Sequence, residues 1–277
     1  MIDVLVPILL VAPVALALWW AWARVAGNPR SRFRALLEGT VFTNLAFVLV
    51  LLGANEVAKL RRWQAMGELF RRGDTEERVV ALTFDDGPTA AYADSVLGLL
   101  EREGVRATFF VIGQDLERAP EVGRRLAAAG HELGNHSYTH RVMAARPLRE
   151  VRREVERTDR AIRATGYAGP IHFRSPYGKK LLVLPYYLAR EGRTHVFWDL
   201  EPESDPEVEA SAGAIARHVV DGARPGSVVL LHPWYGSRRR TREALPAIVR
   251  GLKARGFRFV TVSELMAMSG RDRSGER

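Results

Sequence analysis

Short apolar runs alternate with amphipathic stretches along most of this 277-residue chain. The apolar runs are brief, rich in β-branched and aromatic residues and bounded by turn-forming residues, which is typical of buried strands. They cover residues 79–82, 106–112, 131–136, 171–174, 195–200, 227–232 and 257–262. Between them, apolar positions recur at helical spacing over residues 90–103, 121–129, 147–165, 180–190, 207–221 and 241–254.

A glycine follows each predicted helix, where helix C-termini favour a left-handed residue. The alternation of strands and helices predicts a parallel sheet with helical crossovers. Seven such units in roughly 190 residues favour an incomplete (β/α) barrel over a closed eight-fold one.

Two longer apolar stretches precede these units. Residues 4–23 are long enough to cross a bilayer, and three tryptophans stand near their end, where an interfacial belt is expected. A cleavable signal peptide is the alternative. The N-terminus carries Asp3 and no basic residue, which favours a retained span.

The second apolar stretch, residues 35–54, is interrupted by Glu38 and Asn44. If both stretches cross, the arginine-rich loop between them is cytoplasmic, and the C-terminal domain lies on the extracytoplasmic side of the cell membrane. The alternative is an amphipathic helix that lies on the membrane or packs on the catalytic domain. We therefore expect a membrane anchor over 1–54, a charged linker over 55–77, a catalytic domain over 78–268 and a disordered tail over 269–277.

Composition narrows the possible chemistry. The chain has no cysteine, so disulfides, thiolate metal sites and cysteine nucleophiles are excluded. Its formal net charge is +9, which favours anionic partners. No zinc finger, RNA-binding signature or interleaving of aromatic and basic residues is present, so we expect no nucleic-acid partner.

Two adjacent carboxylates, Asp85 and Asp86, stand where the first strand of the main domain turns at Gly87-Pro88. Neighbouring side chains at a strand end point in different directions, so one carboxylate can bind a metal while the other acts as a base. A simple turn is the alternative, because all four residues favour turns.

His136 and His140 are four residues apart, a spacing that places both on one side of a helical turn and lets them share a metal ion. Asp86 is the natural third ligand. Arg174, Asp199 and His232 also stand at the ends of predicted strands, so all these residues belong to the carboxyl face of a barrel, which carries the active site. Each has a structural explanation alone, but together they indicate a catalytic site.

The chain contains four motifs: TFDDGP at 83–88, HSYTH at 136–140, RSPYG at 174–178 and LLH at 230–232. Their order and separation resemble those of the polysaccharide deacetylase family (carbohydrate esterase family 4, the NodB homology domain). The resemblance covers about residues 79–266. It implies an α/β fold, a distorted (β/α)7 barrel, which in this chain follows the membrane hairpin expected from the two apolar stretches. It also implies a divalent metal, most often Zn²⁺ and sometimes Co²⁺ or Ni²⁺, and removal of acetyl groups from N-acetylated sugars.

The resemblance also assigns roles to residues. Asp85 matches the catalytic base, and Arg174 the arginine that holds it. Tyr177 matches the residue whose backbone N–H faces the oxyanion and His232 the general acid, while Leu230 matches the residue that lines the pocket for the acetyl methyl. The metal ligands implied are Asp86, His136 and His140.

The sequence departs from the family pattern after the fifth predicted strand. No tryptophan stands at the expected place in the fourth motif, so Asp199 or Glu201 is expected to steady Arg174. Trp234 or Tyr235 is expected to supply the aromatic flank of His232, and Trp234 is expected to contact substrate. Pro233 follows His232 where aspartate is frequent, which leaves the tuning of the His232 pKa open.

These observations predict a metal-dependent deacetylase of N-acetylglucosamine-type residues in a cell-envelope glycan. A deacylase of a lipid-linked sugar and a non-catalytic glycan-binding module are the alternatives. The sequence gives no prediction of oligomeric state.

Overall fold

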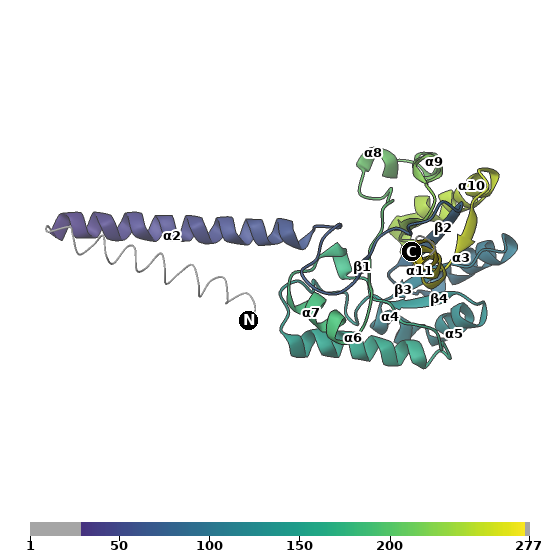
Figure 1. Ribbon diagram of the computed structural model, residues 1–277, viewed down its shortest axis with the longest axis horizontal. Helices are drawn as coiled ribbons and strands as arrows, with labels where there is room; N and C mark the ends of the chain where they lie inside the picture. Colours follow the sequence, from purple (N-terminus) through teal and green to yellow (C-terminus); the bar gives the residue numbers. More distant parts are fainter. Residues whose placement is uncertain (1–28, 275–277) are drawn as a thin grey trace.

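The computed structural model describes residues 29–274. It begins with the long helix α2 (Pro29–Ala58), which extends away from the α/β domain (Figure 1). The predicted first membrane span, residues 4–23, lies outside the described residues, so the hairpin is not tested. Within α2, Glu38–Ala58 is 21 residues long and apolar enough to cross a membrane, by length and composition only.

The main sheet has five parallel strands in the order β4-β3-β2-β6, with β7 also paired to β2. Its strands are β2 (Val79–Asp85), β3 (Thr108–Val111), β4 (Glu132–Asn135), β6 (Ser227–Leu231) and β7 (Arg258–Val260). A second parallel pair is formed by β1 (Leu69–Phe70) and β5 (His195–Val196). The predicted parallel α/β fold is therefore confirmed.

The described strands do not form a regular closed barrel. Isolated bridges at Phe173 and Leu200 join the two sheets, with Phe173 bridging Asn135 and His195 and Leu200 bridging Val229. The strand predicted over 171–174 is reduced to one bridging residue. After it, the Arg174 backbone N–H still donates to the Asn135 carbonyl at 2.9 Å, and the Arg174 guanidinium donates to the carbonyls of Val196 and Phe197.

The helices of the α/β domain are α3 (Ala90–Arg102), α4 (Gly113–Arg118), α5 (Pro120–Ala128), α6 (Leu148–Arg163), α7 (Val183–Arg190), α8 (Pro206–Glu209), α9 (Ala212–Gly222), α10 (Arg239–Ala254) and α11 (Val262–Ser274), with 3₁₀ turns η1 (Pro176–Gly178) and η2 (Gly236–Arg238). Most helices pack in the outer core of the sheet, whereas the last one, α11, packs with the inner cluster through Val262 and Leu265. Alternate side chains of β2 pack into two different hydrophobic cores, one on each face of the sheet. Val80, Leu82 and Phe84 pack with the helices, whereas Val79 and Ala81 pack with the inner cluster.

The single helix predicted over 207–221 is two helices in the structure. The side chain of Asp205 caps α8, and the Ser211 hydroxyl accepts a hydrogen bond from the Ala214 N–H at the start of α9. Both are residue types that favour helix N-termini, so a second cap inside the periodic stretch starts a new helix.

The segment expected to be a charged linker, residues 55–77, is part of the fold. α2 continues to Ala58, and β1 pairs with β5. The Gln64 side chain lies 2.9 Å from Nδ1 of the buried His195. A linker prediction based on charge missed this packing, in which the apolar pair Leu69 and Phe70 forms β1.

The C-terminal tail also differs from the prediction. α11 runs to Ser274, so residues 269–274, expected to be disordered, are helical. The Ser269 hydroxyl donates to the Leu265 carbonyl and accepts from the Asp74 N–H, which ties this helix to the segment before β2.

Candidate active site

The turn after β2 presents two carboxylates at the carboxyl end of the sheet. Asp85 is the last residue of the strand, and Asp86 follows with a φ of +74°. Gly87 has a φ of +54°, and a Cβ at this position would lie 2.6 Å from the Trp234 ring. Only glycine fits there, so packing of the Trp234 ring against Gly87 fixes the Asp-Asp-Gly turn.

His136 and His140 approach each other through an irregular turn after β4, not through the helical turn that their spacing predicted. Ser137 and His140 both have positive φ, at 66° and 56°. The chain can hold this shape because side chains accept its free amide hydrogens. Asn135 Oδ1 accepts the Ser137 N–H at 2.9 Å.

Glu154 of α6 supports the same turn, and sequence reasoning missed it. Its carboxylate accepts the N–H groups of Tyr138 and Thr139 at 3.0 and 2.8 Å and the Thr139 hydroxyl at 3.0 Å. Three hydrogen bonds to one nearly buried carboxylate fix the loop between the two histidines. A glutamate at an inward position of a predicted helix was the available signal.

Asp86, His136 and His140 form a group that could hold a metal ion, with one ligand atom from each all within 4.8 Å of one another. Asp86 Oδ1 is buried and has no protein hydrogen-bond partner. His136 Nδ1 lies 2.9 Å from the Arg174 carbonyl oxygen; since a carbonyl only accepts, Nδ1 carries the proton and Nε2 is free to bind a metal.

The state of His140 fits the same use. Burial, followed by the positive charge that His136 can carry, lowers the pKa of His140 to about 4. The imidazole is therefore neutral at neutral pH, which is the form that binds a metal. The donor set of two imidazoles and one carboxylate is one that Zn²⁺ accepts, with positions left for water and substrate.

Arg174 holds Asp85 in a fully buried ion pair, with its Nη1 2.6 Å from Asp85 Oδ1. The same nitrogen donates to the Thr83 hydroxyl at 2.8 Å, and the guanidinium lies 4.0 Å from the Phe110 ring centroid. Burial raises the pKa of Asp85, but the charges of Arg174, His136 and His232 outweigh burial and lower it below its usual value. Asp85 is therefore ionised and ready to accept a proton.

Asp199 and Glu201, which were predicted to steady Arg174, bind other groups in the structure. Asp199 accepts hydrogen bonds from the Val228 N–H and the Ser227 hydroxyl, and Glu201 accepts from Ser204. The prediction was wrong because Arg174 already uses backbone carbonyls and Thr83 beside Asp85.

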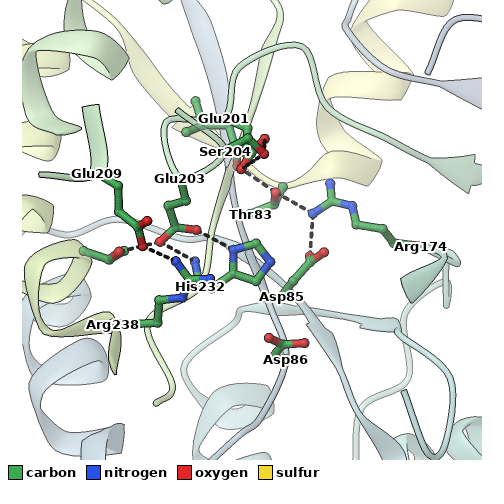
Figure 2. A network of polar contacts seen from close by, with 12 residues as sticks. Thr83, Asp85, Asp86, Arg174, Glu201, Glu203, Ser204, Glu209, His232 and Arg238 are labelled. Atoms are coloured by element: carbon green, nitrogen blue, oxygen red, sulfur yellow. Dashed lines mark hydrogen bonds and ion pairs between the residues drawn. The ribbon is translucent and has the colours of Figure 1, made fainter. Parts of the chain in front are cut away.

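Glu203 is the partner of His232, and sequence reasoning missed it (Figure 2). Its carboxylate accepts a short hydrogen bond from His232 Nδ1 and another from the Thr241 hydroxyl. Burial lowers the pKa of His232, but the hydrogen bond and charge of Glu203, with the charges of Asp85 and Asp86, raise it to about 9. His232 is thus protonated at neutral pH, with Nε2 left to donate.

Tyr177 stands at the rim, with a φ of +59° and a ring 4.7 Å from that of His140. Its side chain is 62% exposed, so it is accessible to a substrate. Leu230 lies two residues before His232 on the inner side of β6 and is 2% exposed. Tyr235 comes three residues after His232, and its hydroxyl donates to Asp115 at 3.4 Å.

Comparison with known proteins shows the family of this chain. The profile of the family described as "Polysaccharide deacetylase" matches residues 72–194. A peptidoglycan-N-acetylglucosamine deacetylase of Bacillus cereus is 34% identical over 71% of this chain and 71% of its own length. A chitooligosaccharide deacetylase of Bradyrhizobium sp. is 37% identical over 68% of this chain and 90% of its own. The chain belongs to the polysaccharide deacetylase family.

A solved member of the polysaccharide deacetylase family has the same fold. The Bc1960 peptidoglycan N-acetylglucosamine deacetylase superposes with a TM-score of 0.68 at 30% identity, over 72% of this chain and 92% of that structure. Relatives can be much longer: a bifunctional xylanase/deacetylase of Pseudobutyrivibrio xylanivorans is 36% identical, but the match covers 31% of it.

Trp234, predicted to contact substrate, is fully buried against Gly87 and Phe109 in this family member. We expect Trp234→Ala to lower the free energy of unfolding by about 3–5 kcal/mol, the usual cost of deleting a large buried aromatic side chain. Urea unfolding measures this loss, and the more conservative Trp234→Phe should leave KM unchanged. A raised KM in a stably folded Trp234→Phe variant would instead support the predicted contact between Trp234 and substrate.

Proposed function

We propose that this polysaccharide deacetylase family member is a metal-dependent hydrolase that removes the N-acetyl group from N-acetylglucosamine-type sugars of a cell-envelope glycan. The observation that carries the proposal is the pairing of an ionised buried Asp85 with a protonated His232 beside three candidate metal ligands. One group accepts a proton and the other donates one, which is what amide hydrolysis requires.

A divalent metal held by Asp86, His136 and His140, most simply Zn²⁺, would supply a Lewis acid for the amide carbonyl and a water of lowered pKa. Asp85 takes the proton of the attacking water, and Arg174 keeps the free oxygen of Asp85 directed at the site. His232 donates from Nε2 to the departing sugar amine, since Nδ1 is committed to Glu203. The Tyr177 backbone N–H is the candidate donor to the carbonyl oxygen as it gains charge.

The location of the enzyme belongs to the same proposal. We place α2 across the cell membrane and the α/β domain on the extracytoplasmic side, supported by the length and composition of Glu38–Ala58 and by the arginine-rich residues before it.

A lipid-linked sugar is the second candidate substrate. It is favoured by the contact between the end of α2 and the segment that follows Tyr177, where the Lys180 N–H donates to the Ala58 carbonyl at 2.9 Å. That contact holds one rim of the site near the end of the proposed membrane helix. A non-catalytic glycan-binding module is the least supported reading, because such a module has no use for a proton acceptor and a proton donor facing one site.

Removal of the metal tests the proposed reaction. We expect the full chain in detergent to release acetate from an N-acetylglucosamine oligomer, to lose this activity on chelation and to regain it with Zn²⁺. His140→Ala should bind less zinc and lose most activity, whereas His218→Ala, on α9 away from the site, should behave as the unchanged protein. The full chain is required because residues before Asp74 pack on the domain.

Acetate release that survives complete chelation would contradict metal dependence. Release from a detergent-dispersed lipid-linked sugar, but not from the soluble oligomer, would select the second substrate. Zinc-loaded, folded protein that is inactive on both would favour the binding module.

A further inference from the structure

Exposed apolar side chains of the α/β domain gather on three neighbouring segments. Outside α2, the exposed large apolar residues of the described chain are Leu60, Trp63, Val142, Leu148, Tyr177, Leu182, Tyr186 and Tyr235. All except Tyr235 come from residues 60–63, 142–148 and 177–186. Exposed apolar residues scattered singly need no explanation, but a concentration of them marks an interaction surface.

Hydrogen bonds tie one of these segments to the end of α2. The Lys180 backbone N–H donates to the Ala58 carbonyl at 2.9 Å, and its ammonium group donates to the Leu60 carbonyl. The Lys179 ammonium donates to Asn55 Oδ1 at 3.3 Å. Lys180 is only 2% exposed, so this connection is part of the packed domain. α7 therefore begins beside the point where α2 ends (Figure 1).

A basic groove continues this surface onto α6. The first turns of α6 and the end of α7 enclose a groove of about 450 Å³ lined by Leu148, Arg149, Arg152, Tyr187, Arg190 and Glu191. Three guanidinium groups face one carboxylate there, although Arg152 also pairs with Glu156 at 2.8 Å. Arginine stems beside leucine and tyrosine suit a surface that is apolar near its base and cationic at its edge.

We propose that this surface docks on an anionic phospholipid bilayer. We call it the α6–α7 face and define it by the apolar residues Leu60, Trp63, Leu148, Leu182 and Tyr186 and the basic residues Arg149, Arg152 and Arg190. The domain then lies against the membrane that α2 enters, with the Tyr177 rim of the active site close to the lipid headgroups.

Continuity with α2 selects a bilayer over a protein partner or a second copy. Only 6% of the apolar window in Glu38–Ala58 is buried in the protein, which is the condition of a helix surrounded by lipid. Leu60 and Trp63 follow directly after this helix, at the depth where tryptophan prefers the interface. The arginines complement the negative surface of anionic lipid. The inference rests on the proposed anchoring by α2 and does not depend on deacetylase activity.

The absence of cysteine allows a direct test. One residue of the full chain, Leu148, Leu182 or Tyr186, is replaced by cysteine, and the cysteine is labelled with a nitroxide. The labelled protein is then reconstituted in vesicles with or without phosphatidylglycerol. Ser95→Cys is the water-exposed control, because Ser95 is exposed on α3, a helix at the opposite end of the domain from α2 in Figure 1. Leu49→Cys in α2 is the lipid control. The measured quantity is label accessibility to oxygen relative to a water-soluble nickel complex.

We expect this ratio at positions 148, 182 and 186 to be several-fold higher than at 95 in anionic vesicles. It should fall towards the value at 95 when Arg149, Arg152 and Arg190 are all replaced by glutamine, while the ratio at 49 stays high. Ratios equal to that at 95, with the label at 49 in lipid, would overturn the docking and leave the anchor intact.

Two further outcomes would also overturn it. A water-exposed label at position 49 would remove the anchoring on which the docking rests. Spin–spin broadening at 182 or 186 that disappears on dilution with unlabelled protein, without contact with lipid, would assign the face to a second copy of the chain. None of these readouts requires turnover, so they are separate from a failure of the proposed reaction.

Discussion

Asp85→Asn is expected to lower kcat by about 10²–10⁴-fold, the usual contribution of a positioned general base. Asparagine has nearly the same shape and can still accept from Arg174, but it cannot take a proton from water. The candidate metal ligands are unchanged, so zinc content should be unchanged. Acetate release and metal analysis on the same preparation measure both quantities.

The same substitution is expected to affect stability. It leaves the fully buried Arg174 without its anionic partner, and breaking a buried ion pair from one side typically costs about 3–5 kcal/mol. Activity must therefore be compared at a temperature where circular dichroism shows both proteins to be folded. Asp94→Asn is the matched control, because Asp94 is exposed and pairs with the surface residue Arg125 at 2.8 Å. A folded, zinc-loaded Asp85→Asn enzyme with normal kcat would remove Asp85 from the reaction.

Glu203→Gln is expected to move the alkaline limb of the kcat–pH profile to lower pH. His232 must be protonated to donate to the leaving amine, so activity is present below its pKa and is lost as the pH rises through that value. Glu203 contributes most to raising this pKa to about 9. Without its charge, the limb should move from about pH 9 towards the ordinary histidine value of 6.5.

The control for this prediction is Glu201→Gln. Glu201 lies in the same loop, and its replacement removes the same charge. Its carboxylate, however, accepts a hydrogen bond from Ser204 and not from His232. Its alkaline limb should stay in place. An equal shift in both variants would indicate a general effect of loop charge, and no shift in Glu203→Gln would show that another group sets the limb.

Much of the site could be predicted because its residues stand at strand ends. The apolar run before Asp85 and the one before His232 are buried strands in the structure, paired directly with each other from Val80–Ser227 to Phe84–Leu231. Strand order then brings the two side chains to the same edge. Predicting the residues needed only the periodicity and the motifs.

The supporting contacts could not be predicted in the same way. Glu203 lies in an irregular loop, and its distance to His232 depends on where α8 and α10 place that loop. The turn between His136 and His140 needs left-handed backbone at Ser137 and His140, which neither residue type indicates. Trp234 follows a strand end, as a substrate-binding residue would, but the glycine turn above it encloses its ring.

The packing of residues 59–72 on the domain also restricts how far the domain can move relative to α2. A flexible tether of that length would let a domain sweep a volume tens of ångströms across, on the order of 5–6 Å times the square root of its residue number. Here β1 pairs with β5, and Lys180 bonds to the chain at Ala58 and Leu60, so the segment spans a set distance. With α2 anchored as proposed, the catalytic centre works at one height above the lipid, and only acetyl groups that pass through that layer come within its reach.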